Sequence, residues 1–300
     1  MTNLLIRADD VGYTHINNLG VFRAIDEGIV TSADLMLDCE GFDEAVEFLK
    51  ARPWISVGWH AHFWGSPVLG PDKVPSMVNE QGRFKFRKDK TGELRRSCNY
   101  DEVLAECRAQ LERVCDRLGR VPDYTHGRLE VEPGSFDAAR MQACKEFGIP
   151  TAFCLKHNIK DGEIVGIQEQ PSERFKDLDI FFVNQPATVY KTCYAENYTE
   201  RMTYDPAAYT MSNPEGCEAH KTVIMAWHPG YLDEHILGES TLHVGRIQDI
   251  EALCSETLKQ WIRDKKIRLM NYRDALYGTD SYQNHLRVIG SDLYMGPRED

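Results

Sequence analysis

The chain has 300 residues, of which 42% are hydrophobic, and a formal net charge of −12 at pH 7. This apolar fraction is normal for a globular protein, and no apolar run is long enough to cross a membrane as a helix. The acidic balance argues against binding to nucleic acid or to an anionic membrane.

Cysteine usage favours a reducing compartment. The nine cysteines are odd in number and form no C-x-x-C pair, which disfavours a disulfide framework. The N-terminus, MTNLLIRADD, lacks the basic start, apolar core and cleavage site of a signal peptide. We therefore expect a cytoplasmic protein. Its oligomeric state stays open, with a homodimer as one alternative.

Short β-rich runs alternate with helical patterns along the chain, and the helical patterns show apolar residues at three- and four-residue spacing. In chain order, the pattern predicts strand Leu4–Ala8, helix Asn17–Glu27, strand Ile29–Leu37, helix Phe42–Ala51, strand Ile55–Trp59, helix Asp101–Leu118, strand Val121–Thr125, helix Phe136–Phe147, strands Thr151–Leu155, Ile180–Val183 and Lys221–Trp227, helix Val244–Ile262 and strand Ile267–Met270.

Alternating β and α units imply a parallel sheet with right-handed crossovers. Because the strands are spread over the whole chain, we expect an α/β fold with one irregular, TIM-like (β/α) barrel over residues 1–278. Segments 64–100 and 186–219 interrupt the alternation and are interpreted as long loop insertions, and 279–300 as a peripheral tail. No glycine-rich nucleotide-binding motif follows a strand, which disfavours an open doubly wound sheet.

Titratable residues stand at the ends of four predicted strands, where the carboxyl ends of parallel strands share one rim. They are Asp9 and Asp10 after the first strand, His60 and His62 after the third, His126 after the strand from Val121, and His228 after TVIMAW.

Each of these residues also has an ordinary structural explanation. The Asp pair could form a helix cap, His60 and His62 a half-exposed strand face, and the other two histidines could belong to turns. Their coincidence at four strand ends favours a site. One carboxylate with two neutral imidazoles suits a divalent metal with open positions for water and substrate. A second carboxylate could then act as a general base.

Five stretches resemble the YdjC/ChbG family of carbohydrate deacetylases: RADDVGYTHINNLGVFRAIDEGIVTSADLM, SVGWHAHF, THGRLEVEPGSF, MAWHPGYLD and IRLMNYRDAL. They run in family order from residue 7 to residue 276. The resemblance implies a TIM-barrel-like fold, a divalent metal (Zn or Mg) and hydrolysis of an N-acetyl group on an amino sugar.

Carried over by position, the resemblance implies Asp10, His60 and His126 as metal ligands. It implies Asp9 as the general base and His228 as the general acid. His62 would be a pocket residue, because family members usually have no histidine there.

The chain departs from the family after the fourth predicted strand. Tyr124 stands where the family has an Asp two places before the ligand His126, and Arg128 and Glu130 replace histidines. Such neighbours orient ligating histidines, so the substrate or metal preference could differ. Arg128 adds a cation, and we hypothesise a substrate with a carboxylate or phosphate.

Aromatic residues near the rim divide into two groups. Phe63 and Trp64, just past a strand end, are predicted to contact a sugar, as are His62 and Arg128. Trp59 and Trp227 are expected to face the helical layer as core residues.

The sequence therefore predicts a metal-dependent hydrolase that removes the N-acetyl group from a small amino sugar or oligosaccharide and releases acetate. Two alternatives are a metal-dependent sugar isomerase or epimerase, and a barrel that binds a sugar without catalysis. Neither a nucleic acid nor a membrane is expected as a partner.

Overall fold

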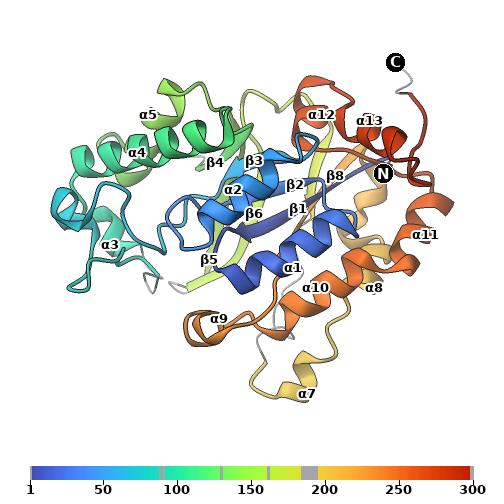
Figure 1. Cartoon of the computed structure of the whole chain (residues 1–300), viewed down its shortest axis with the longest axis horizontal. Coiled ribbons are helices and arrows are strands. Elements are labelled where there is room, and N and C mark those ends of the chain that lie inside the picture. The colour runs from blue at the N-terminus through green and yellow to red at the C-terminus, as the bar shows by residue number, and fades with distance from the viewer. Residues whose placement is uncertain are drawn as a thin grey trace.

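The computed structural model describes residues 2–87, 89, 92–128, 131–160, 163–183 and 195–297. Within these residues one mixed sheet forms the centre of the molecule, and helices surround it (Figure 1). Glu130, one of the residues that departs from the family pattern, lies outside the described residues.

The sheet follows the order β6-β5-β4-β3-β2-β1-β8-β7, and β9 pairs with β1. All pairings are parallel except the antiparallel β5–β6 pair. The two end strands, β6 and β7, also approach each other, so the sheet is nearly closed into the expected barrel. The strands are β1 Asn3–Val11, β2 Ser32–Leu35, β3 Ser56–Trp59, β4 Tyr124–Arg128, β5 Thr151–Lys160, β6 Glu163–Pro171, β7 Ile180–Val183, β8 Thr222–Trp227 and β9 Arg268–Leu269.

The main helices cover the sheet (Figure 1); most of them connect successive parallel strands, and the last two follow the final strand. They are α1 His15–Asp26, α2 Phe42–Lys50, α4 Tyr100–Leu118, α5 Phe136–Glu146, α10 Val244–Cys254, α11 Glu256–Asp264, α12 Tyr272–Tyr277 and α13 Ser281–Val288. The remaining described helices are α3 Glu93–Arg96, α7 Tyr198–Arg201, α8 Pro206–Met211 and α9 Glu234–Glu239, together with the 3-10 turns η1 Pro71–Lys73, η2 Pro75–Met77 and η3 Pro214–Ala219.

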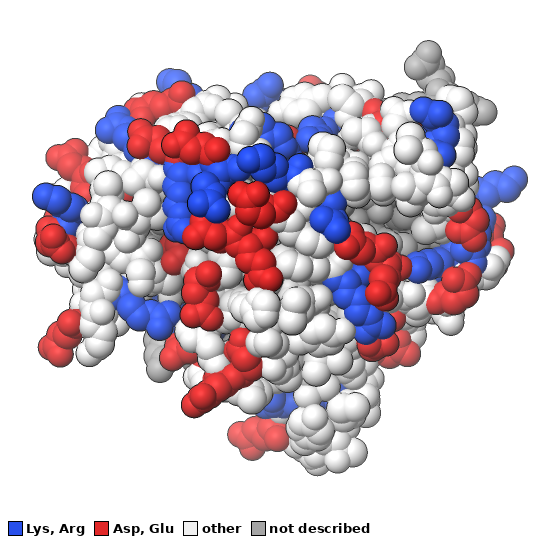
Figure 2. Space-filling view, in the orientation of Figure 1, with Lys and Arg blue, Asp and Glu red and all other residues white. Residues whose placement is uncertain are grey.

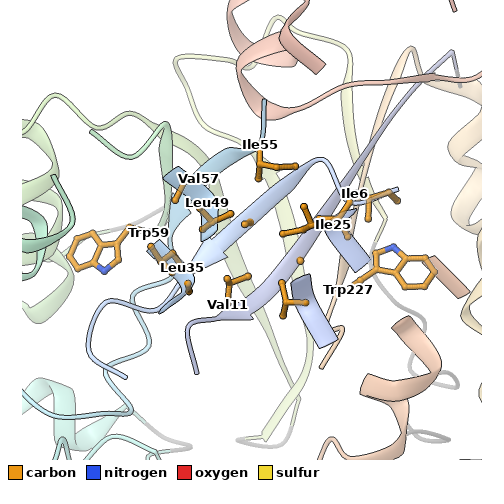
Figure 3. Packing of buried hydrophobic residues seen from close by; sticks show 14 of the residues in the cluster. Ile6, Val11, Ile25, Leu35, Leu49, Ile55, Val57, Trp59 and Trp227 are labelled. Atoms are coloured by element: carbon orange, nitrogen blue, oxygen red, sulfur yellow. The ribbon is translucent and has the colours of Figure 1, made fainter. Parts of the chain in front are cut away.

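The main core lies between the strands and their helices. Leu35 and Val57, from neighbouring strands, pack near Leu49 of α2 (Figure 3), and all three side chains are fully buried. Trp59 and Trp227 are 1% and 3% exposed and belong to the same cluster, which confirms that they are core residues. Burying each such side chain stabilises the fold by roughly 1.5–3 kcal/mol.

Several element boundaries differ from the prediction, among them the end of β1, which continues past Ala8 to Val11 and so contains both aspartates. Strand β4 starts at Tyr124 instead of Val121, since Pro122 has no N–H to donate to the sheet. The strand also continues past Thr125 to Arg128, so His126 lies inside it. The predicted helix Val244–Ile262 is split at Ser255, whose side chain accepts from Leu258 N and caps α11. β5 continues past Leu155 into a hairpin with β6.

The C-terminal segment is part of the main core. Residues 279–300 were expected as a peripheral tail, but Ser281–Val288 form α13, and Tyr282, Leu286 and Leu293 are buried in the main cluster. Asn271 donates to Ser281 Oγ at 2.7 Å and links this segment to α12. The apolar spacing of these three residues is what the prediction overlooked.

The described parts of the two insertions contain short elements only. Segment 64–100 holds η1, η2, α3 and an antiparallel bridge between Val78 and Phe84. Of segment 186–219, the described part holds α7, α8 and η3. No helix in the described part of the chain is both long and apolar enough to cross a membrane. On the face shown in Figure 2, acidic and basic side chains are interspersed.

Candidate active site

A bulge at the end of β1 brings both aspartates to the rim. The β1–β2 register shifts between Ala8 and Val11, and Asp10 has a left-handed backbone with φ 60°. Neighbouring side chains on a regular strand point to opposite faces. A left-handed aspartate costs about 1–3 kcal/mol and is typical of functional sites. Both carboxylates are buried, and both interact with His228.

Asp10 and His60 form a pair of buried polar atoms that lack ordinary partners. Asp10 Oδ1 lies 3.3 Å from His60 Nε2. Neither atom has a hydrogen-bond partner among the residues that the structure describes. Two ligands about 2.1 Å from one cation in tetrahedral geometry are separated by roughly 3.4 Å. A carboxylate and an imidazole in this arrangement fit a divalent cation.

Arg246 holds the other oxygen of Asp10. Its Nη2 donates to Asp10 Oδ2 at 2.6 Å, and both residues are buried. Burial alone raises the pKa of Asp10, but Arg246 and the histidines His60 and His228 outweigh this and hold it well below its usual value. Asp10 is therefore a charged carboxylate whose Oδ1 faces His60.

Two histidines, His62 and His126, are candidates for a third metal ligand beside Asp10 and His60. His62 Nε2 lies 3.9 Å from Asp10 Oδ1, and ligand atoms of Asp10, His60 and His62 lie within 4.8 Å of one another. His126 instead bonds through Nε2 to Asp34 and forms a similar group with Asp34 and His60. The structure thus brings Asp10 and His60 together as predicted, and it places His62 closer to Asp10 than its pocket role implied.

Asp34 is a site residue that sequence reasoning missed. It lies on β2, its side chain is fully inaccessible to solvent, and it contacts His60 and His126. It escaped notice because it precedes the end of its strand. The available signal was a carboxylate inside an apolar predicted strand, since a buried charge requires partners.

Arg7 fixes the orientation of Asp9. Its Nε and Nη2 donate to the two Asp9 oxygens at 2.6 and 3.1 Å, and the same guanidinium bonds both oxygens of Glu169 at 3.0 and 3.1 Å. Burial opposes a charged Arg7, but Asp9 and Glu169 raise its pKa well above the ordinary value. Arg7 lies two positions before Asp9 on the same strand and carried no predicted role.

His228 lies across from Asp9. Its Nε2 is 3.8 Å from Asp9 Oδ2, so the two predicted catalytic residues are neighbours. Burial lowers the pKa of His228, although Asp9 and Asp10 act in the opposite direction. Its backbone N–H donates to Asp249 at 2.8 Å, which anchors the end of β8 to α10.

A stacked group borders this rim. The His62 ring stacks on Trp64 with centroids 4.0 Å apart and planes at 2°. The Arg87 guanidinium lies 3.9 Å from the Trp64 ring centroid. Trp64 and His62 keep partial exposure, so their edges can meet a ligand.

The other two predicted substrate contacts differ in exposure. Phe63 is fully buried and packs edge-on against Phe84 and Phe136. It therefore belongs to the core and offers no surface to a sugar. Arg128 is 37% exposed, and its Nε donates to Asp137 at 2.8 Å.

Comparison with known proteins identifies the family. The profile of the YdjC-like protein family matches residues 3–264. A carbohydrate deacetylase of Brevibacillus brevis is 30% identical over 277 residues, covering 90% of this chain and 98% of that protein. Carbohydrate deacetylase 2 of Listeria innocua is 29% identical over 280 residues, with the same coverage.

More distant relatives agree with this result. A chitooligosaccharide deacetylase of Yersinia enterocolitica is 27% identical, covering 91% of this chain and 98% of that protein. A crystal structure from Enterococcus faecalis, described as a cellobiose-phosphate cleavage protein, shares the fold with a TM-score of 0.60 at 22% identity. It covers 91% of this chain and 98% of that one. With the family profile matching nearly the whole length and the rim residues assembled at one end of the barrel, the chain belongs to the YdjC-like family.

Proposed function

We propose that this chain is a metal-dependent carbohydrate deacetylase that hydrolyses the N-acetyl group of an amino sugar or oligosaccharide and releases acetate. One observation carries the metal part: the buried atoms Asp10 Oδ1 and His60 Nε2 lie 3.3 Å apart without other partners in the described structure. Membership of a family whose curated relatives are named carbohydrate deacetylases supports the reaction and the substrate class.

Asp10 and His60 would hold the cation together with a second imidazole. The resemblance favours His126 for this position, and the short approach to Asp10 favours His62. An imidazole-containing set suits zinc better than magnesium, which prefers oxygen ligands. A bound divalent cation would lower the pKa of a water molecule and polarise the acetyl carbonyl.

Asp9 and His228 supply the proton transfers in this proposal. Asp9 accepts a proton from the attacking water, whose oxygen forms a bond to the acetyl carbon. When the C–N bond breaks, the proton taken up by Asp9 passes to His228, and His228 Nε2 gives it to the departing amine, so both residues return to their starting states. The 3.8 Å between His228 Nε2 and Asp9 Oδ2 lets both groups reach one reacting centre. Arg7 keeps the Asp9 carboxylate in a fixed orientation through two hydrogen bonds.

The stacked pair of His62 and Trp64 is the proposed sugar platform. Arg128 remains the proposed contact for an anionic substituent, acting beside Asp137. A substrate panel should therefore contain neutral N-acetylglucosamine oligomers and their carboxylated or phosphorylated counterparts.

An acetate-release assay tests the reaction. Protein supplied with zinc or magnesium should liberate acetate from at least one N-acetylated sugar, and Asp9→Asn and His126→Ala should lose most of this activity. Full activity in both variants would exclude the assigned machinery. A product of unchanged mass would instead indicate an isomerase or epimerase, and sugar binding without turnover or retained metal would indicate a binding protein.

We also place the protein in the cytoplasm, because all the cysteines in the described residues are free and free thiols are typical of reducing compartments. A homodimer stays a prediction that sedimentation of the purified protein would test.

A further inference from the structure

One carboxylate, Asp34, faces two histidines of the candidate site, His60 and His126. Its Oδ2 lies 3.3 Å from His60 Nδ1 and bonds His126 Nε2. Its Oδ1 accepts a hydrogen bond from the Tyr124 hydroxyl. Arg7 Nε approaches Oδ2 to 3.5 Å and supplies positive charge. The carboxylate is thus fixed from several directions in a site with no solvent access.

The sheet is built to allow this contact. Asp34, Gly58 and Tyr124 stand opposite one another on three adjacent strands, in one cross-strand row. A Cβ on Gly58 would lie 2.5 Å from Asp34 Oδ1 and would also collide with the Tyr124 ring. Glycine on the middle strand therefore lets the tyrosine reach across β3 to the aspartate. Glycine weakens a strand and marks sites where other groups approach closely.

Asp34 determines which ring nitrogens are left for a metal. A carboxylate accepts hydrogen bonds, so an imidazole nitrogen facing it carries the proton. His60 Nε2 lies 3.3 Å from Asp10 Oδ1, so a cation bound between these two atoms would take the place of a proton on Nε2, while Asp34 keeps the proton on Nδ1. His126 keeps its Nδ1 lone pair. Carboxylates in this position orient ligating histidines and raise their basicity.

We propose that Asp34 is a positioning residue that orients His60 and His126 for the metal. Tyr124, which occupies the place of an aspartate in the resembling family, serves this arrangement as the donor that holds Asp34. The carboxylate beside His126 is thus supplied from β2, two strands away from β4. This inference rests on the proposed metal site and deepens it.

Zinc affinity is the direct test, measured on the purified full chain by competition with a chromophoric chelator. Asp34→Asn keeps the size of the side chain and removes the second acceptor oxygen. We expect it to bind zinc about 10- to 100-fold more weakly than the unchanged protein. Tyr124→Phe keeps Asp34 and removes one bond to it, so we expect a smaller but measurable weakening, by about two- to tenfold.

Glu106→Gln is the matched control. Glu106 is also fully buried, and it accepts hydrogen bonds from the backbone of Val68 and Leu69 and from Gln110. None of these partners is a histidine of the candidate site, so the Glu106→Gln variant should bind zinc as tightly as the unchanged protein. The absorption bands of the cobalt-substituted protein should shift in Asp34→Asn and stay constant in Glu106→Gln.

The outcomes separate this inference from the proposed function. If the unchanged protein binds no zinc, magnesium or cobalt, the metal site itself is refuted. If it binds zinc and Asp34→Asn binds equally well, only the role of Asp34 is overturned. If Asp34→Asn abolishes binding while Asp10→Asn does not, Asp34 is a ligand and not a positioning residue. Should Asp34→Asn fail to fold, an unchanged affinity in Tyr124→Phe would overturn the inference.

Discussion

Replacing Arg7 with methionine should destabilise the protein far more than removing a comparable surface arginine. Arg7 is 1% exposed and forms paired hydrogen bonds to both Asp9 and Glu169. Methionine keeps an unbranched apolar stem of similar length and removes the guanidinium. Two carboxylates, and the nearby Asp34 at 3.5 Å, then lose their common counter-charge.

The expected magnitude follows from the burial of these groups. Hydrogen bonds to charged groups contribute about 1.5–3 kcal/mol each, but four of them do not simply add, because a freed carboxylate can take up a proton or gain water. Breaking a buried ion pair by removing one partner costs about 3–5 kcal/mol. We therefore expect the free energy of unfolding to fall by about 3–5 kcal/mol in Arg7→Met. The loss should shrink at acidic pH, where the abandoned carboxylates are protonated.

Urea unfolding at pH 7 measures this effect, and Arg52→Met is the control. Arg52 also forms paired bonds to one carboxylate, Asp26, at 2.6 and 2.7 Å, but the Asp26 side chain is 44% exposed. Exposed pairs contribute about 1 kcal/mol or less. Arg7→Lys keeps the positive charge but lacks the paired N–H donors of the guanidinium, so it should be more stable than Arg7→Met and less stable than the unchanged protein. Equal losses in Arg7→Met and Arg52→Met would refute the reasoning.

Three further predictions concern other parts of the site. Burial raises the pKa of Asp249 to about 7, although hydrogen bonds from His228 N and Tyr204 and the charge of Arg246 act in the opposite direction. Between about pH 4 and pH 7 the folded protein therefore binds this proton more tightly than the unfolded chain does, so the free energy of unfolding should fall as the pH rises through this range. In Asp249→Asn the free energy of unfolding in urea should depend less on pH over this range, and an unchanged slope would contradict the raised pKa of Asp249. Trp64→Ala should raise the KM for the sugar by about tenfold or less with little change in kcat, because the stacking surface binds substrate and transition state alike; a loss confined to kcat would contradict the platform role. Gly58→Ala should cost about 1–3 kcal/mol through overpacking and should weaken zinc binding as Tyr124→Phe does, whereas a stable variant with normal affinity would show that the close contact is dispensable.

Much of the fold could be predicted from local patterns. The alternation of strands and helices and the apolar spacing of α4 are properties of short segments, and the parallel barrel follows from them. The break at Ser255 and the late start of β4 depended on single residues that cap a helix or lack an N–H. The burial of α13 depended on packing against residues more than two hundred positions away, such as Val30, whose carbonyl accepts from the Tyr282 hydroxyl.

The sequence by itself determined that Asp9, Asp10, His60 and His228 would meet, because parallel strands deliver their carboxyl ends to one rim. Only the tertiary structure decided how these groups are held. It paired Arg7 with Asp9 and Arg246 with Asp10. Cross-strand register brought Asp34, Gly58 and Tyr124 into one row. Register is set by long-range pairing of strands, so a carboxylate buried within β2 gave no local sign that it faces two histidines from other strands.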